Sequence, residues 1–527
     1  MRTPFLAILA PLALAAVAAA VAFAAPVPLY AARPATSGPT DKLVTLTTAS
    51  EMAGIPGVPS PARATSAITA TNRFVTAPGD LPQIHITGTG ATAPGYIFLS
   101  NMWAVGQSYL LIVDDLGQPV YYQSRGTGHP GVNFTKQPDG TLTWYDFETG
   151  QHQAMDQAYQ LTNTWAISGF ATTDLHELQV LTNGNALIQS YNNVTVDLSA
   201  YGGVTNAIVE DLVLQEQDGL KNPVFTWSAL AHLPVTATYE SLTGGFAPVY
   251  HGNAIERDTD GNLLLSNRHT AQIVKIDRAT GNVLWKLGGR DNDFTFVNDT
   301  GFSYQHDIRR LENGHITLFD NGNPHEGFPR PTPYSRAVEY EIDEVSKVIT
   351  RVWEYRGSPD IYGEYMGNVQ RLPNGNTFIG WGGPATIGTE VTPGGEVALE
   401  MSIDTAVYGG NYRWFRFPWV GRPSTLPALV SRGGTLYFSW NGATEIASYR
   451  VEGSATLTGS FSTIDTPVRA GFETSTTLGL SAARMCYFRV MPIDRAAADT
   501  RYSATVYDPV DPACPPAVLT FIPHISR

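Results

Sequence analysis

The chain has 527 residues, of which 50 are glycine and 36 are proline, while only 15% carry a charge. A chain of this length exceeds what one hydrophobic core supports, and its turn-rich composition favours β-structure over long, salt-bridged helices, so two or three β-rich domains are expected. The formal net charge of -14 repels nucleic acid phosphates, and no nucleic acid partner is expected.

The N-terminal segment has the pattern of a signal peptide over residues 1–25. Arg2 precedes an apolar run from Phe5 to Ala25, and small residues at 22–24 supply a cleavage site. The mature protein is therefore expected to be secreted or periplasmic. An uncleaved signal anchor is the alternative, because the run is barely long enough to span a bilayer, and membrane attachment is expected only in that case.

Residues 26–94 are predicted to form a linker followed by a few accessory strands. They are rich in Pro, Ala, Ser and Thr, and short alternating stretches occur at 67–71 and 84–87.

One pattern recurs four times in the central part of the chain. A polar residue heads a short strand, Asn or Asp precedes Gly at a turn, and a second apolar strand follows. Asn-Gly and Asp-Gly predict hairpins with type I′ turns, which need positive φ at both central residues. The four segments are 175–185, 251–262, 305–315 and 367–376.

A second strand pair follows in several of these units, for example 273–277 and 283–285. Four strands per unit is typical of a β-propeller blade. The uneven spacing of the turn glycines fits about six blades with insertions. We therefore predict an all-β fold with a six-bladed β-propeller over 95–422, the alternative being unrelated hairpins in a sandwich. The turn glycines are Gly140, Gly184, Gly261, Gly314 and Gly375.

The C-terminal part, 423–527, is predicted to be a separate small β-sandwich. The strand with Trp440, the strand with Tyr449 and the strand 487–490 follow in an order that resembles a fibronectin type III module. Cys486 and Cys514 are the two cysteines of the chain, and in an oxidising compartment a disulfide between them is predicted. Two buried free thiols are the alternative.

Histidines lie at or near the head of three of the repeats: His176, His251 and His306. Because a propeller brings its inner strands to one channel, these residues are expected to meet there, and Arg268 follows an inner strand. Neutral imidazole is a nucleophile near pH 7, while imidazolium and guanidinium hold the oxygens of a charged group. This combination predicts transfer of a phosphoryl or sulfuryl group.

The same segments resemble the nucleotide-independent arylsulfotransferases, a family of six-bladed propellers. The resemblance covers roughly residues 94–420 and is strongest from 250 to 325. The matching blocks are 251–255, 266–269, 273–276, 285–288, 305–307 and 319–322.

The resemblance implies that His306 takes a sulfuryl group from an aryl sulfate donor, forming a sulfohistidine that passes the group to a phenolic acceptor. It implies that His251 and Arg268 stabilise the sulfuryl oxygens, with His251 also exchanging a proton with the phenolic oxygen. His176 would be a further catalytic histidine. Asn253 and Asn368 are candidates for substrate binding, and no cofactor and no metal are expected.

Two other classes of function remain open. Three imidazoles with a water molecule are a catalytic zinc pattern, so a histidine-ligated, metal-dependent enzyme is one alternative. The other is a secreted propeller that binds ligands without catalysis.

Overall fold

The computed structural model describes residues 68–70, 73–508 except 331, 384–386, 405–406, 408, 480–481, 483 and 495–500, and also Cys514. The predicted signal peptide and most of the predicted linker lie outside these residues. All described residues belong to one compact unit, 61–527. Within them, no helix is both long enough and apolar enough to cross a membrane.

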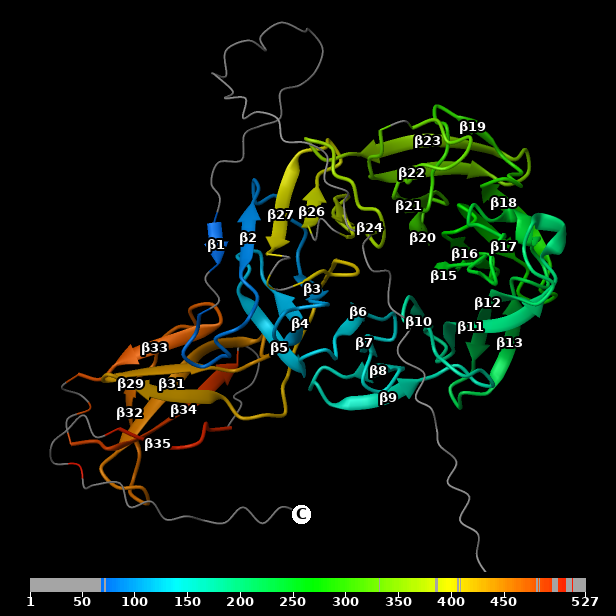
Figure 1. Ribbon diagram of the computed structural model, residues 1–527. Helices are drawn as coiled ribbons and strands as arrows, with labels where there is room; N and C mark the ends of the chain where they lie inside the picture. The colour runs from blue at the N-terminus through cyan, green and yellow to red at the C-terminus, as the bar shows by residue number, and fades with distance from the viewer. Residues whose placement is uncertain are drawn as a thin grey trace, which may run out of the picture. The chain divides into compact units, whose positions relative to one another are not determined.

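The fold is all-β, with six successive sheets that each contain four antiparallel strands. Figure 1 shows these sheets arranged around a common centre. Each sheet contacts the next through its innermost strand, and the sixth contacts the first. The six sheets therefore close into a ring.

The strands of the ring are grouped by sheet, in order of pairing. The first sheet has β28 (Phe415–Phe417), β3 (Tyr96–Ser100), β4 (Ser108–Val113) and β5 (Pro119–Gly126); the second has β6 (Gly131–Lys136), β7 (Leu142–Asp146), β8 (Gln151–Met155) and β9 (Leu161–Trp165). The third has β10 (Leu178–Val180), β11 (Ala186–Val196), β12 (Ala207–Gln217) and β13 (Pro223–Ser228), with β14 (Phe246–Ala247) beside β12; the fourth has β15 (Gly252–Arg257), β16 (Leu263–Asn267), β17 (Gln272–Ile276) and β18 (Val283–Gly288). The fifth has β20 (His306–Arg310), β21 (Ile316–Asp320), β22 (Arg336–Asp343), β23 (Val348–Tyr355) and β19 (Thr295–Val297); the sixth has β24 (Asn368–Arg371), β25 (Thr377–Gly380), β26 (Ile387–Val391), β27 (Val397–Ile403), β2 (Ile84–Thr87) and β1 (Ile68–Ala70). Two 3-10 turns, η1 (Ser199–Tyr201) and η2 (Val235–Ala237), complete the regular elements of this part.

The two ends of the ring are tied by strand pairing. β28 pairs antiparallel with β3, placing Phe415 opposite Phe98. Upstream of β3, β2 pairs with the outer strand β27 of the sixth sheet, and β1 pairs with β2. The strands of the N-terminal accessory region therefore extend a sheet of the ring.

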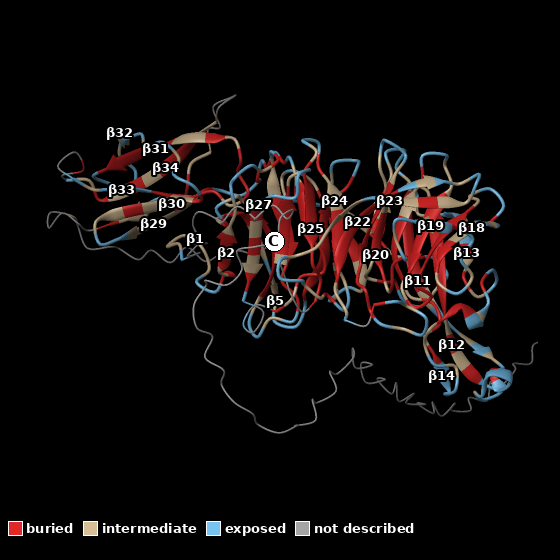
Figure 2. Cartoon of the chain, turned by 90° about the horizontal axis from the view of Figure 1, so that it is seen from above, coloured by how far each residue is buried: buried red, intermediate tan, exposed pale blue. Residues whose placement is uncertain are grey.

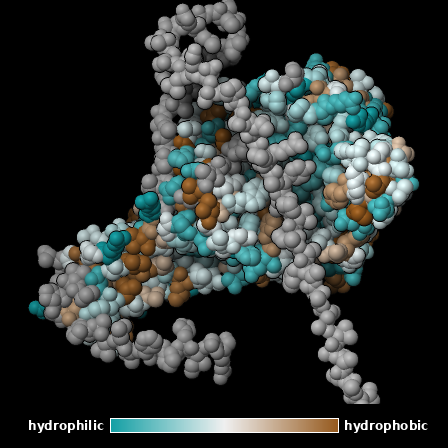
Figure 3. Space-filling model, viewed as in Figure 1, coloured by the Kyte–Doolittle hydropathy of each residue, from teal (hydrophilic) through white to brown (hydrophobic). Residues whose placement is uncertain are grey.

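The core lies between the sheets, so each sheet is buried on both faces. Along β16, Leu263 and Leu265 pack against the third sheet, whereas Leu264 packs against the fifth. Burial on both faces explains why β16 has apolar residues at consecutive positions. In a strand with one exposed face, apolar and polar residues would alternate. Figure 2 shows buried strands through the ring and exposed loops at its edges, with the extension around β12 and β14 standing out from it. On the face of Figure 3, the hydrophobic residues of the described part form small separate groups.

The repeated hairpins are present, but the predicted type I′ turn is wrong. At each turn the glycine has φ between +83° and +89°, whereas the Asn or Asp before it does not have positive φ. Gly314 N–H bonds to Leu311 O, and Leu311 N–H bonds to His315 O, which is a type I turn followed by a left-handed glycine. The side chain of the Asn or Asp accepts the N–H two residues later at 2.9–3.1 Å, which explains its place in the repeat.

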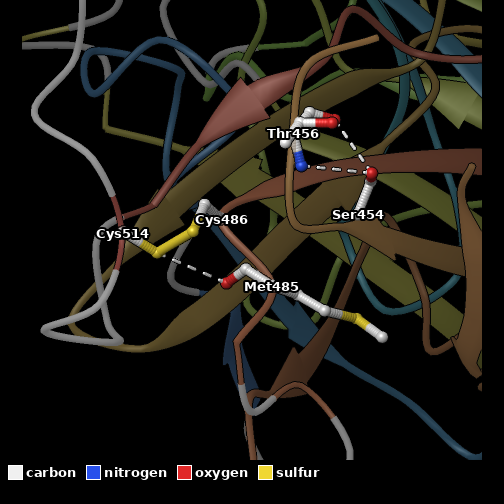
Figure 4. Close-up of a disulfide and its surroundings, with 5 residues drawn as sticks. All are labelled: Ser454, Thr456, Met485, Cys486 and Cys514. Carbon is white, nitrogen blue, oxygen red and sulfur yellow. Dashed lines mark hydrogen bonds between the residues drawn. A yellow bond between two sulfur atoms is a disulfide. The ribbon is translucent and has the colours of Figure 1, made fainter. Parts of the chain in front are cut away.

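The C-terminal part contains two facing sheets. Phe438, Tyr449, Val451 and Phe488 belong to the apolar cluster of this part. Cys486 and Cys514 form a disulfide, drawn in Figure 4 beside Met485. One sheet has β29 (Ala428–Arg432), β30 (Thr435–Ser439) and β33 (Glu473–Thr477), and the other has β32 (Ser462–Asp465), β31 (Ile446–Ser454), β34 (Tyr487–Asp494) and β35 (Val506–Tyr507).

Replacement of a turn glycine tests the role of the left-handed backbone. Gly314→Ala is expected to lower the free energy of unfolding by about 1–2 kcal/mol, because an added Cβ meets no atom within 4 Å and only the φ of +85° opposes it. The measurement is urea unfolding. The exposed Gly219 lacks a positive φ, so Gly219→Ala is the control, and equal effects of the two changes would contradict the turn assignment.

Candidate functional site

The heads of the inner strands bring histidines together at one end of the ring centre. The rings of His176 and His251 lie 4.7 Å apart, centroid to centroid, and His269 stacks on His251 at the same distance. Burial places the pKa of His251 well below its usual value, and the charges of His176, His269, Arg268 and His306 lower it further, so these five side chains form one electrostatic cluster. We call it the histidine cluster.

Strand register places His251 opposite Arg268. Gly252 pairs with Asn267 between β15 and β16, and Arg268 N–H bonds to His251 O at 2.7 Å.

The predicted equivalence of the three histidines needs a correction. His176 and His306 stand eight residues before their turn glycines, whereas His251 stands ten before Gly261, and Asn253 holds the equivalent position.

Arg268 is a half-buried cation that makes no ion pair with a carboxylate among the described residues. Its Nη2 donates to Glu364 O at 3.1 Å, its guanidinium lies 4.7 Å from the Tyr304 ring centroid, and its buried Nε has no partner among the described residues. Burial lowers the pKa of Arg268. Because a partly buried charge without an ion-pair partner is costly, this geometry favours an anionic ligand.

His306 is held as one tautomer. Its Nδ1 lies 2.7 Å from Asn321 Oδ1, while Asn321 Nδ2 donates to the carbonyls of Gly363 and Met366 at 2.7 and 3.0 Å. Asn321 must therefore present its oxygen to the imidazole, so Nδ1 carries the hydrogen. The unprotonated Nε2 accepts a hydrogen bond from Met366 N–H at 3.1 Å.

The imidazole of His306 is also held neutral. Burial and the charge of Arg268 place the pKa of His306 well below its usual range, against the hydrogen bond to Asn321. A neutral, buried imidazole with its Nε2 lone pair fixed in direction is a nucleophile prepared by its surroundings.

The other two histidines of the cluster have different partners. His176 Nδ1 lies 2.8 and 2.9 Å from the two carboxylate oxygens of Asp174. His269 Nδ1–H donates to Pro248 O at 2.6 Å, and burial followed by the charge of Arg268 lowers the pKa of His269 to about 3. His176 is thus the member of the cluster with a carboxylate beside it.

The two asparagines predicted to bind substrate use their amides within the protein. Asn253 donates to Gln305 O at 2.8 Å and accepts from Asp307 N–H at 3.4 Å, which ties β15 to both neighbours of His306. Asn368 bonds to both peptide groups of Trp414 and joins β24 to the segment before β28. Their geometry is that of bridges between sheets.

An ion network occupies the ring centre next to the cluster. Arg413 Nη1 lies 3.1 Å from Glu177, and Arg309 Nη2 lies 2.7 Å from both Glu177 and Asp307.

A pocket of about 260 Å³ lies at the ends of the inner strands that are opposite to the histidine cluster, and it is lined in part by Arg309 and Glu256. Burial raises the pKa of Glu256 to about 7. The pocket and the histidine cluster are therefore different sites.

Sequence reasoning did not assign roles to His269, Asn321, Asp174 or Arg413. His269 and Asn321 fall inside matched blocks, but their roles depend on partners distant in sequence. In the described part of the chain, no group of three or more His, Cys, Asp or Glu side chains has an arrangement suited to a metal ion.

The family described as arylsulfotransferase (ASST) matches residues 139–404, half of the chain, and this range contains the whole histidine cluster. The chain belongs to the arylsulfotransferase family. This is a family of enzymes.

A curated relative is the arylsulfate sulfotransferase AssT of Escherichia coli O6:H1, which is 32% identical over 166 residues. That match covers 25% of this chain and 27% of AssT, so the chain spans about a quarter of the length of the relative it matches. Among solved structures, a protein of unknown function from Bacteroides caccae is similar over 61% of this chain and 98% of its own, with 12% identity and a TM-score of 0.39. Virginiamycin B lyase from Staphylococcus aureus is similar over 64% and 84%, with 12% identity and a TM-score of 0.30.

The unpaired Arg268 predicts binding of a tetrahedral oxyanion. Inorganic sulfate is expected to raise the melting temperature of the wild type, because a ligand that binds the folded state stabilises it by mass action. Arg268→Ala should remove this dependence. Arg290, exposed and paired with Glu326, supplies the control Arg290→Ala, which should retain it; a sulfate response that survives in Arg268→Ala would exclude this residue as the anion site.

The depressed pKa of His269 predicts a loss of stability in acid. An unfolded histidine titrates near about pH 6.5, so below that pH the unfolded state binds more protons and the free energy of unfolding falls as pH falls. His269→Gln is expected to lessen this fall by up to about 1.4 kcal/mol per pH unit between pH 6.5 and the folded pKa. Urea titrations of both proteins at pH 7, 6 and 5 measure the slope, and identical slopes would contradict the prediction.

Proposed function

We propose that this protein is an exported aryl-sulfate sulfotransferase that acts through a sulfohistidine on His306. The proposed organisation is a signal peptide at 1–25, an accessory region at 26–94, a six-bladed β-propeller at 95–422 and a fibronectin type III-like sandwich at 423–527. The closed ring of six sheets and the two facing C-terminal sheets support this organisation. The proposed location is secreted or periplasmic.

The observation that carries the proposal is a neutral histidine beside an unpaired arginine. His306 directs the lone pair of Nε2, and Arg268 makes no ion pair with a carboxylate among the described residues. A sulfuryl group needs a nucleophile at sulfur and positive charge at its oxygens, and the cluster offers both. Family membership adds the substrate class, aryl sulfates.

In the first half-reaction, His306 Nε2 attacks the sulfur of the donor. The bond between sulfur and the aryl oxygen breaks, and its electron pair leaves with the phenolic product. In the second half-reaction, the oxygen of the acceptor phenol attacks the same sulfur, and the electron pair of the S–N bond returns to Nε2. The proton of the acceptor phenol passes to a histidine of the cluster and replaces the proton that the departing aryl oxygen took in the first half-reaction. Two transfers therefore leave the enzyme unchanged.

Arg268 and His251 stabilise the oxygens of the sulfuryl group during its transfer. The guanidinium is placed by its stacking on Tyr304, and His251 is placed by its backbone pairing with Arg268. Planar donors in a water-poor site stabilise charge more strongly than they would in water. Met366 N–H, now bonded to Nε2, must give up that bond when the sulfohistidine forms.

The proposal is tested with 4-nitrophenyl sulfate as donor and phenol as acceptor. The wild type is expected to release nitrophenol and to carry one sulfuryl group on His306. This group is detected by mass spectrometry of peptides after the reaction has been stopped without acid. His306→Ala should lose turnover by at least about 10³-fold, because the nucleophile is removed.

A matched control is His232→Ala, since His232 stacks on Trp227 outside the cluster and should be dispensable. Turnover that persists in His306→Ala, or a sulfuryl group on another residue, would overturn the assignment of the nucleophile.

A further inference from the structure

We propose that Asp174 and His176 form the proton-transfer pair for the aryl oxygen, with His176 the acid and base and Asp174 its positioning residue. This inference rests on the proposed sulfuryl transfer. It assigns a role to Asp174 and moves to His176 the proton exchange that sequence resemblance implied for His251.

The first observation is the geometry of the pair. Both Asp174 oxygens lie within 2.9 Å of His176 Nδ1, and one of them also accepts the His176 backbone N–H at 2.8 Å. Gln189 Nε2 donates to the same carboxylate at 2.7 Å. Asp174 therefore holds the His176 ring in one orientation, with a hydrogen on Nδ1 and Nε2 directed away from the carboxylate.

The second observation is that the carboxylate is kept charged. Burial alone would raise the pKa of Asp174, but His176 and the hydrogen bonds from His176 and Gln189 outweigh burial, and the pKa lies below its usual value. A buried carboxylate on Nδ1 stabilises the imidazolium and fixes Nε2 as the atom that gives or takes a proton.

The third observation is that the other histidines of the cluster lack this support. The rings of His176 and His269 each lie 4.7 Å from the His251 ring, centroid to centroid, and neither ring nitrogen of His251 has a hydrogen-bond partner within the described residues. His269 donates Nδ1–H to a backbone carbonyl, and His306 donates Nδ1–H to an amide oxygen. A second positive charge on His251 would face Arg268, whereas a charge on His176 faces Asp174.

The remaining ionisable groups around the pair do not replace Asp174. Glu210 of β12 and Tyr145 of β7 lie within electrostatic range of Asp174, and burial, followed by the charge of Asp174, raises the pKa of both. Tyr191 bonds to Gly252 O, and Tyr412 lies 5.7 Å from the His176 ring, centroid to centroid. Asp174 is the carboxylate in direct contact with the imidazole.

The proton balance follows from this arrangement. As the S–O bond of the donor breaks, protonated His176 gives its Nε2 proton to the aryl oxygen, and a neutral phenol leaves. In the return half-reaction, neutral His176 takes the proton of the acceptor phenol at Nε2 while that oxygen attacks sulfur. His176 ends the cycle protonated, as it began.

The test compares donors whose leaving phenols differ in basicity. A general acid matters most for a basic leaving group, so Asp174→Asn should slow sulfuryl transfer from phenyl sulfate by about 10²–10⁴-fold. Transfer from 4-nitrophenyl sulfate, whose phenolate leaves without a proton, should fall less than about 10-fold. The dependence of kcat/KM on the pKa of the leaving phenol therefore becomes steeper in the variant.

Controls separate this role from a structural one. Asp211→Asn alters another buried carboxylate, bonded to Ser228 and Leu230, and should leave the leaving-group dependence unchanged. Asp174→Glu should restore part of the phenyl sulfate rate. His176→Gln should reproduce the steeper dependence and serves in place of Asp174→Asn if that variant does not fold.

The outcomes are distinguishable. Equal losses of kcat/KM with both donors, or an unchanged dependence of kcat/KM on the pKa of the leaving phenol, would overturn the roles proposed for Asp174 and His176. The proposed sulfuryl transfer would still stand. Absence of sulfuryl transfer by the wild type from any aryl sulfate would overturn the proposed function itself.

Discussion

Side-chain amides of Asn and Gln that hydrogen-bond to the backbone of a neighbouring segment hold inner strands of this ring in register. Asn253 bonds to the backbone on both sides of His306, and Asn368 bonds to both peptide groups of Trp414. Gln370 makes the same pair of bonds to Arg416 on the next strand. Since buried polar groups without partners are costly, these pairings fix β15 against β20 and β24 against β28. The position of His306 follows from the first of these pairings.

The resulting centre separates charge in a way that suits group transfer. On one side, Arg413, Arg309, Glu177 and Asp307 neutralise one another. On the other, the histidine cluster keeps one guanidinium without an ion pair among the described residues and holds the imidazoles of His251, His269 and His306 neutral. A ligand with negative oxygens supplies the missing counter-charge. Stability and anion affinity thus oppose each other at Arg268, as expected where a site is built for a charged group.

The hairpin turns show how a correct local signal led to a wrong local geometry. Asn-Gly and Asp-Gly did mark every hairpin of the repeat. The left-handed residue is the glycine alone, and the preceding side chain instead accepts the N–H two residues later. Both geometries use the same residue pair, so the sequence could not choose between them. The positions of His176 and His306, eight residues before the glycine, follow from the turn; that of His251, ten before it, does not.

The sequence by itself determined the all-β class, the hairpins, and the presence of histidines and one arginine at the heads of repeated strands. These features depend on local patterns: turn residues, apolar runs and spacing along the chain. Only the tertiary structure decided which atoms face each other. The tautomer of His306 depends on Asn321, whose orientation is set by carbonyls more than 40 residues away. The isolation of Arg268 and the contact between Asp174 and His176 likewise depend on burial and on neighbouring sheets, which no local pattern encodes.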